Sequence, residues 1–232
     1  MGRIMQKRLV RKVELEMLLS HIESNPSPRP DLEQYTIPTD IAAAMLHIAA
    51  YSNNDIVNKT VVDLGCGTGR LALGAAFLGA KEVVGVDIDR NVVKLAFEKS
   101  VEMGLKEKTL WIAGDIDAVQ GDFDTVLQNP PFGVQRREAD RRFLDKALRM
   151  ANVVYSLHKH PKHVEAFAEG SKPYKPDIIQ VAPSPFLKRF IERRRGKIRA
   201  VYAMIMTVPH MFSFHEKRKH EFVVDLFVID KK

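Results

Sequence analysis

Cysteine is almost absent from this chain, which has 232 residues and a single cysteine, Cys66. One cysteine excludes an internal disulfide and any zinc site that needs several thiolates. Because disulfides typify oxidising compartments, this scarcity favours a reducing one, and we expect a cytoplasmic protein. Cys66 itself is more typical of a small residue in a tight loop than of a nucleophile.

Long apolar segments are missing too. No run of about 18 apolar residues occurs, so the sequence predicts no membrane-spanning helix. The charged N-terminus is not followed by an apolar stretch of signal-peptide length, and we expect no secretory leader. The 45% apolar composition is ordinary for a globular protein, and the length favours a single domain over 1–232.

Acidic side chains are outnumbered by basic ones, 29 to 36, and the formal net charge is +7. Much of the excess lies in four runs, at 3–12, 136–149, 188–199 and 217–219. One basic run can be merely a solvated helix face. Four runs together favour a polyanionic partner, most simply a nucleic acid.

The chain changes rhythm near residue 60. Before it, apolar spacing predicts helices at about 7–23 and 39–50, separated by a proline-rich break at 25–30. After it, strands and helices alternate as in a doubly wound parallel sheet. We expect strands at 60–64, 82–87, 108–113, 123–128, 152–157, 198–208 and 221–229, and helices at 69–79, 90–103, 138–150, 161–169 and 185–195. The last two strands should pair antiparallel, and about 170–185 resembles an insertion.

A glycine-rich loop follows the first expected strand and its acid, Asp63, with glycines at Gly65, Gly67 and Gly69. Glycines let the backbone turn tightly and approach a ligand at the carboxyl end of a strand. The spacing Gly-x-Gly-x-Gly differs from the Gly-x-Gly-x-x-Gly of dinucleotide sites. S-adenosylmethionine has no pyrophosphate but carries an ammonium and a sulfonium, so an acid ahead of the loop suits it better than a dinucleotide.

Two further acids follow the next strands. Asp87 stands 22 residues after Gly65 (87 − 65), the usual place for a carboxylate that binds ribose hydroxyls. Asp115 follows the third strand and can accept a hydrogen bond from the adenine amine of the cofactor. Any one acid could be a helix cap or turn residue, as Asp89 is expected to be. Three acids after three successive strands favour S-adenosylmethionine.

The fourth strand ends in the most informative segment, Asn129-Pro130-Pro131-Phe132. Two prolines fix φ and push the residue before each towards extended geometry, so the turn is stiff. The Asn129 amide and the Pro130 carbonyl can accept hydrogen bonds from a planar –NH2 group, while the Phe132 ring can stack on a flat substrate. The segment predicts methyl transfer to a planar nitrogen, with adenine N6 as the favoured acceptor.

Other residues are weaker candidates. His158, His160 and His163 are close in sequence, but adjacent lysines and the lack of a nearby acid or cysteine argue against a metal site, and we expect none. Trp111 is expected in the core. The arginines that follow the reactive segment are favoured as contacts to an RNA backbone: Arg136, Arg137, Arg141 and Arg142.

Taken together, the motifs resemble the small N6-adenine ribosomal-RNA methyltransferases of archaea and eukaryotes, a methyltransferase-like family acting on small-subunit rRNA. The resemblance covers nearly the whole chain. It rests on Leu32-Glu33-Gln34-Tyr35, Asp63-Leu64-Gly65-Cys66-Gly67, Asp87-Ile88-Asp89, Asn129-Pro130-Pro131-Phe132-Gly133, Tyr155-Ser156-Leu157-His158-Lys159 and Phe214-His215.

This resemblance implies a seven-stranded class I methyltransferase sheet, six strands parallel and one antiparallel, behind an N-terminal helical extension over 1–50. It implies that Asn129 to Phe132 receive the adenine. It also implies a set of cofactor-binding residues: Gln34, Ile37, Asp63, Gly65, Gly67, Gly69, Asp87, Ile88, Asp115, Ile116 and Asn129. Relatives often have Thr at the position of Ile37, so only backbone contacts are expected there. Eukaryotic relatives work with a small zinc-containing activator protein, and an equivalent partner is implied here.

Three rival functions remain. Protein glutamine N5-methyltransferases also use a planar amide, but with an Asn-Pro-Pro-Tyr segment and a separate N-terminal substrate domain. DNA adenine methyltransferases usually carry a distinct target-recognition region. A non-catalytic RNA-binding factor in ribosome assembly could keep the fold, although the intact Asn129 segment and acids argue against idleness.

Overall fold

The computed structural model describes residues 9–132, 138–161, 178–209 and 219–231. Its strands are β1 (Thr60–Leu64), β2 (Glu82–Asp87), β3 (Thr109–Ala113), β4 (Phe123–Gln128), β5 (Ala151–Lys159), β6 (Ile179–Gln180), β7 (Gly196–Pro209) and β8 (Lys219–Lys231). Its helices are α1 (Lys12–Ser20), α2 (Thr39–His47), α3 (Arg70–Phe77), α4 (Arg90–Glu102), α5 (Ala139–Met150) and α7 (Pro185–Arg193). Short turns of helix are η1 (Pro30–Leu32), η2 (Ile48–Ser52), η3 (Lys106–Lys108) and η4 (Ile116–Ala118).

All the strands join one sheet in the order β3-β2-β1-β4-β5-β8-β7-β6. Neighbours from β3 to β5 pair in parallel, whereas β8 pairs antiparallel with both β5 and β7. β7 therefore runs with β1 to β5, which confirms the predicted core of six parallel strands and one antiparallel strand. The predicted count of seven was one short, because β6 adds an antiparallel pair to the outer edge of β7. A strand of two residues has no periodicity by which a sequence could show it.

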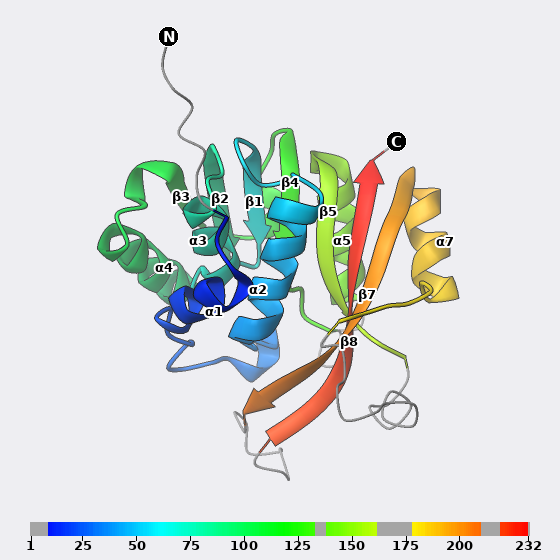
Figure 1. The fold of residues 1–232 in the computed structure, drawn as a ribbon, viewed down its shortest axis with the longest axis horizontal. Helices are drawn as coiled ribbons and strands as arrows, with labels where there is room; N and C mark the ends of the chain where they lie inside the picture. The colour runs from blue at the N-terminus through cyan, green and yellow to red at the C-terminus, as the bar shows by residue number, and fades with distance from the viewer. Residues whose placement is uncertain (1–8, 133–137, 162–177, 210–218, 232) are drawn as a thin grey trace.

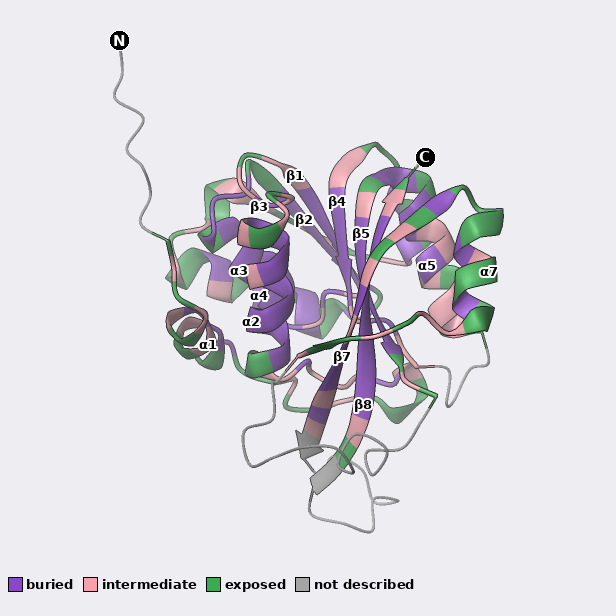
Figure 2. Cartoon of the chain, turned by 45° about the vertical axis from the view of Figure 1, so that its right-hand side comes forward, coloured by how far each residue is buried: buried purple, intermediate pink, exposed green. Residues whose placement is uncertain are grey.

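Helices cover both faces of this sheet, and each face has its own apolar core (Figures 1 and 2). One core packs α1, α2 and α3 against the sheet, and the other packs α5 and α7. β1 supplies both, since Val61 faces the first core and Val62 the second. Burial on both faces explains why the parallel strands are continuous apolar runs rather than alternating ones.

The N-terminal extension covers part of the first core. Leu15 and Leu19 lie one helical turn apart on α1 and are fully buried against α2 and α3. α2 begins at the predicted Thr39 and ends in a π-helical turn, η2, at Ser52. α1 runs from Lys12 to Ser20, so the predicted helix over about 7–23 was too long: 9–11 and 21–23 are not helical, and residues 7 and 8 lie outside the described residues.

β7 and β8 form the predicted antiparallel pair and extend well beyond the rest of the sheet (Figure 1). The partner strand β5 ends at Lys159, opposite Val224, whereas β7 stays paired with β8 as far as Pro209 and Lys219. The predicted helix over 161–169 and most of the predicted insertion lie outside the described residues. Of that insertion, 178–185 contain β6 and the start of α7. Within the described ranges, no helix is both long and apolar enough to cross a membrane.

Candidate active site

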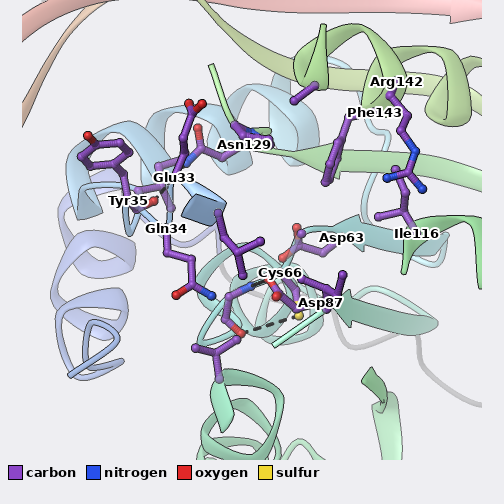
Figure 3. Close-up of a pocket in the computed structure, with 18 of the residues that line it drawn as sticks. Glu33, Gln34, Tyr35, Asp63, Cys66, Asp87, Ile116, Asn129, Arg142 and Phe143 are labelled. Atoms are coloured by element: carbon purple, nitrogen blue, oxygen red, sulfur yellow. Dashed lines mark hydrogen bonds between the residues drawn. The ribbon is translucent and has the colours of Figure 1, made fainter. Parts of the chain in front are cut away.

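A cavity of about 690 Å³ opens at the carboxyl ends of β1 to β4, as the rule for open α/β sheets predicts. In Figure 3, the segment with Gln34 and Tyr35 lies on one side of it, and Ile116, Arg142 and Phe143 lie on the other. Of the predicted site residues, those in its wall are Gln34, Ile37, Asp63, Gly65, Gly67, Asp87, Ile88, Asp115, Ile116, Asn129 and Pro131. Gly69, Pro130 and Phe132 do not line it.

The glycine loop joins β1 to α3 with all three glycines at positive φ, at 72°, 53° and 86° for Gly65, Gly67 and Gly69. L-residues rarely adopt this conformation, so the turn requires glycine. Gly65 also lies against Phe143, whose Cε1 atom would be 3.0 Å from an added Cβ. Gly69 faces Trp111 rather than the cavity and begins α3 as its N-cap.

Asp63 lies beneath the loop and is 1% exposed. One carboxyl oxygen, Oδ2, accepts the backbone N–H of Ala72 at 3.0 Å, whereas Oδ1 is buried with no hydrogen-bond partner among the described residues. Burial raises the pKa of Asp63 to about 8. This carboxyl group is therefore largely protonated at neutral pH, and an adjacent cation would favour its ionised form.

Asp87 positions the glycine loop. Its Oδ2 atom accepts the N–H of Gly67 at 2.9 Å, and its Oδ1 atom accepts the N–H of Asp89 at 2.9 Å. Burial raises the pKa of Asp87, and these backbone N–H groups partly offset the rise. Each carboxylate oxygen keeps a further acceptor position for a ligand hydroxyl. As expected, Asp89 caps α4, accepting the N–H of Asn91 at 2.9 Å.

Asp115 stands at the far end of the cavity and pairs with Arg142 of α5, which also bonds Asp117 at 2.6 Å. Partial burial alone would raise the pKa of Asp115, but the bonds from Arg142 and from the N–H of Asp117 outweigh it and hold the pKa below its usual value. The adjacent Ile116 is buried and offers an apolar wall.

The segment between α1 and α2 forms the opposite wall. Gln34 lines the cavity, but its amide is already bonded: Oε1 accepts from Asn25 and from the N–H of Arg29, and Nε2 donates to Asp89 at 3.0 Å. The two ends of the segment are held by the buried Arg70 of α3. Its guanidinium donates to the carbonyls of Ile22 and Ile37, both at 2.5 Å.

Asn129 projects from the end of β4 into this cavity (Figure 3). Its Nδ2 group lies 3.4 Å from the carbonyl of Tyr35, while its Oδ1 atom is buried without a hydrogen-bond partner in the described part of the chain. Phe132 lies outside the wall, with its ring perpendicular to that of Phe222 in β8 at a centroid distance of 5.5 Å. The structure thus brings Asn129 and Pro131 together with the three acids, and packs Phe132 against the β7–β8 pair.

Tyr35, Arg142 and Phe143 line the cavity, and the sequence did not predict that they would. The last two lie on an amphipathic helix, where no local signal marks a residue that faces a cavity. Arg142 was predicted to contact RNA, yet here its guanidinium binds two carboxylates. Trp111 is a packing residue as predicted, and an added Cβ at Gly85 would be 2.4 Å from its ring.

The histidines also bind protein groups. His158 contacts Ser156 and His160 contacts Asp225, each at 2.8 Å. Over the described ranges, no three or more His, Cys, Asp or Glu side chains are arranged to hold a metal ion. His163, Arg136 and Arg137 lie outside those ranges.

The Arg142–Asp115 pair leads to a testable prediction. Replacing Arg142 by Met removes the hydrogen bond and the positive charge, so the pKa of Asp115 should rise, as measured by carbon-13 NMR titration of the carboxyl groups. Arg141→Met is the matched control, because Arg141 pairs with Glu138 at 2.7 Å. An unchanged Asp115 pKa in Arg142→Met would mean that the ion pair does not form in solution.

Comparison with known proteins agrees with this site. The methyltransferase small domain family matches residues 38–153, half of the chain. The rRNA N(6)-adenosine-methyltransferase METTL5 of Danio rerio is 33% identical over 225 residues, which cover 91% of this chain and 95% of that protein.

Solved structures show the same fold. A crystal structure from Pyrococcus horikoshii, described as a candidate RNA methyltransferase, superposes with a TM-score of 0.79 at 35% identity over 96% of this chain and 98% of that one. The magnesium protoporphyrin IX methyltransferase of Synechocystis, with bound S-adenosylmethionine, shares the fold at a TM-score of 0.56 and 15% identity, over 83% of this chain and 76% of that one. The resemblance seen in the motifs is therefore confirmed: this chain belongs to the methyltransferase small domain family, together with the rRNA N(6)-adenosine-methyltransferases, and is an S-adenosylmethionine-dependent methyltransferase.

Proposed function

We propose that this enzyme transfers the methyl group of S-adenosylmethionine to N6 of an adenosine in ribosomal RNA, specifically in the small subunit, and that it does so in the cytoplasm. The observation that carries the proposal is the Oδ1 atom of Asn129. This acceptor is buried, lacks a hydrogen-bond partner in the described structure and belongs to a side chain in the cavity wall. A buried acceptor without a partner is costly, and an exocyclic –NH2 group would satisfy it.

The residues present fit the cofactor. When bound, S-adenosylmethionine supplies a methyl group on a positively charged sulfur. The proposed holders of its charged part are Asp63 and the glycine loop, because the unpartnered Oδ1 atom of Asp63 would become ionised beside a cation. Asp87 would accept from the ribose hydroxyls, and Asp115 from the adenine amine, with Ile116 against the ring. Gln34 and Ile37 would complete the wall, Ile37 through its backbone.

The mechanism follows from the weakness of the acceptor. An aromatic amine has its lone pair delocalised into the ring and is a poor nucleophile. Hydrogen bonds from its two N–H groups to Asn129 Oδ1 and to the Pro130 carbonyl would favour a tetrahedral nitrogen and stabilise the developing positive charge. The predicted stacking of the adenine on Phe132 would require that its ring, which packs against Phe222 outside the cavity wall, turn towards the substrate. The proton can leave after transfer, so no general base is required.

The surface beside the cavity supports RNA as the substrate. α5 follows the parallel strand β4, and α7 leads into the parallel strand β7, so the N-terminal ends of both helices lie at the same edge of the sheet as the cavity. There Phe186 is 53% exposed, with the guanidinium carbon of Arg141 5.5 Å from its ring centre. Lys188 and Arg189 are exposed one turn further along α7. Exposed aromatic and basic side chains together suit the bases and phosphates of single-stranded RNA.

The rival functions are less well supported. A glutamine side chain would also fit an amide acceptor, but the basic surface on α7 has no evident use for a protein substrate. A DNA substrate would call for a separate recognition region. A non-catalytic role would leave unexplained the buried acids and the unpartnered acceptor on Asn129.

We also propose a partner, a small zinc-containing activator protein that covers the edge of the sheet at β3. β3 is the outermost strand on that side, and its Leu110 is 53% exposed. On α4, Phe97 and Val101 are 43% and 49% exposed and lie one helical turn apart. An unpaired strand edge with exposed apolar side chains is a liability unless it is covered.

Asn129→Ala should abolish most methyl transfer and weaken cofactor binding far less. Removing one preorganised polar group costs about 2–4 kcal/mol of transition-state stabilisation, or about 30- to 1,000-fold in rate. The assay is transfer from labelled S-adenosylmethionine to small-subunit rRNA, large-subunit rRNA, tRNA, DNA and protein. Label recovered as N6-methyladenosine in small-subunit rRNA alone is the expected result, whereas label in protein would favour glutamine methylation. A fully active variant would refute the role of Asn129.

Reversing the charge of Lys188 and Arg189, both to Glu, should weaken RNA binding roughly tenfold at moderate salt and reduce its salt dependence. Fluorescence anisotropy with a labelled rRNA fragment measures both. The matched control is Lys81→Glu with Lys106→Glu, the same change in charge at the amino ends of the strands. Equal losses in the two double variants would mean that only net charge matters.

Leu110→Lys should prevent co-purification of a co-expressed small zinc activator while leaving the binding of S-adenosylmethionine unchanged. Ile179→Lys is the matched control, because Ile179 is 39% exposed on the opposite edge strand, β6. Loss of the complex in Ile179→Lys but not in Leu110→Lys would place the partner on the other edge.

A further inference from the structure

A line of buried polar side chains lies directly beneath the reactive segment, at the ends of β4 and β5. Gln128, Ser156 and His158 are each at most 2% exposed. Nε2 of Gln128 donates to Oγ of Ser156 at 2.8 Å, and Oγ of Ser156 lies 2.8 Å from Nε2 of His158. Beyond the histidine, Nδ1 of His158 lies 3.6 Å from Oδ2 of Asp140 on α5.

The amide nitrogen of Gln128 can only donate, so the Ser156 oxygen accepts from it. The Ser156 hydroxyl and Nε2 of His158 share the next hydrogen bond, whose direction depends on the tautomer of the imidazole. The other ring nitrogen, Nδ1, faces the Asp140 carboxylate. Burial alone would raise the pKa of Asp140, but the influence of His158 and the backbone outweighs it and holds the pKa below its usual value. The 3.6 Å separation is an electrostatic contact, longer than a hydrogen bond.

Serine, histidine and aspartate in this order have the composition of a hydrolase triad, yet the arrangement does not suit a nucleophile. Ser156 is 0% exposed, and no part of it lines the cavity. Its oxygen already accepts a hydrogen bond from Gln128. A group with no access to substrate cannot attack one. Polar side chains are nonetheless costly to bury, so this line calls for another role.

One end of the line adjoins the reactive segment, and the other lies on α5, the next described helix in the sequence. Gln128 is the residue before Asn129, and Asp140 is the second residue of α5, the helix into which the segment leads. Ser156 stands directly opposite Gln128 in the β4–β5 register. His158 is held further by Phe227 of β8, whose ring lies perpendicular to it at 5.5 Å. The line thus ties the sheet directly to the residue before Asn129 and, through His158, brings it against the start of α5.

We propose that Ser156 and His158 are positioning residues for methyl transfer. They hold Asn129 in place by connecting Gln128 and Asp140 to the carboxyl end of β5. This inference rests on the proposed role of Asn129 as the amine receptor. Neither residue touches the substrate. Their effect is on alignment, where a misplacement of about 1 Å can cost about 100-fold in rate.

Ser156→Ala is the first test, with Thr125→Val as the matched control. Thr125 is another buried hydroxyl, on β4, which donates to the carbonyl of Asp55 at 2.5 Å near the other end of the sheet. We expect kcat in Ser156→Ala to fall at least about tenfold, with the dissociation constant for S-adenosylmethionine unchanged and a loss in Tm similar to that of Thr125→Val. Thr125→Val should keep the wild-type kcat. A Ser156→Ala enzyme with wild-type kcat, or an equal loss in both variants, overturns the proposal.

Two further measurements separate positioning from simple instability. In an Asn129→Ala background, Ser156→Ala should reduce the rate no further, because the side chain that it positions is gone. If Ser156→Ala lowers the rate by the same factor in the Asn129→Ala background as in the wild type, the proposal is contradicted. His158→Gln, which can still bond Ser156, should retain more activity than His158→Leu, and equal losses would count against it.

Hydrogen exchange tests the same idea without any substrate. Peptides that cover 123–132 and 138–150 should exchange faster in Ser156→Ala than in wild type, and no faster in Thr125→Val. Should the wild-type enzyme label no RNA, the proposed function fails while this measurement still decides the positioning role. Unchanged exchange in Ser156→Ala would overturn that role.

Discussion

The register of three parallel strands at their carboxyl ends underlies the rest of this site. Leu64 of β1 lies opposite Gln128 of β4, and Gln128 lies opposite Ser156 of β5. The glycine loop, the reactive segment and the His158 contact begin immediately after these three positions. Side chains alternate between the faces of a sheet, so a slip of one residue in β4 would turn Asn129 and Gln128 to the wrong sides. Apolar burial on both faces makes such a slip costly.

Charge is divided along the cavity in a way that matches its two substrates. The inner end holds Asp63 and Asp87, both buried and with raised pKa values, beside backbone N–H groups of the glycine loop. Beside the cavity the surface is basic, with Lys188 and Arg189 on α7 and Arg141 lying over the exposed ring of Phe186. A cationic methyl donor suits the first environment, and a polyanionic acceptor suits the second.

The N-terminal extension is part of the site rather than an addition to it. Gln34 forms part of one cavity wall and donates a hydrogen bond to Asp89. Arg70 holds both ends of that wall segment by donating to the backbone carbonyls of Ile22 and Ile37. Burying a guanidinium is expensive, and donating to two carbonyl oxygens recovers much of that cost. The packing of α1 and α2 on α3 therefore controls the shape of the cavity.

Sequence alone determined the α/β fold, the strand ends that carry the acids and the glycine loop, and the segment around Asn129. These features are local, and a parallel sheet brings the carboxyl ends of its strands to one edge whatever the loops between them. Only tertiary structure decided that Phe132 packs on Phe222 away from the cavity, and that β6 adds an eighth strand. It also decided that Arg142 binds Asp115, 27 residues away, and that Arg70 binds Ile22, 48 residues away. Such partners depend on how helices pack against the sheet, and the spacing of residues along a helix does not specify which distant group each side chain will meet.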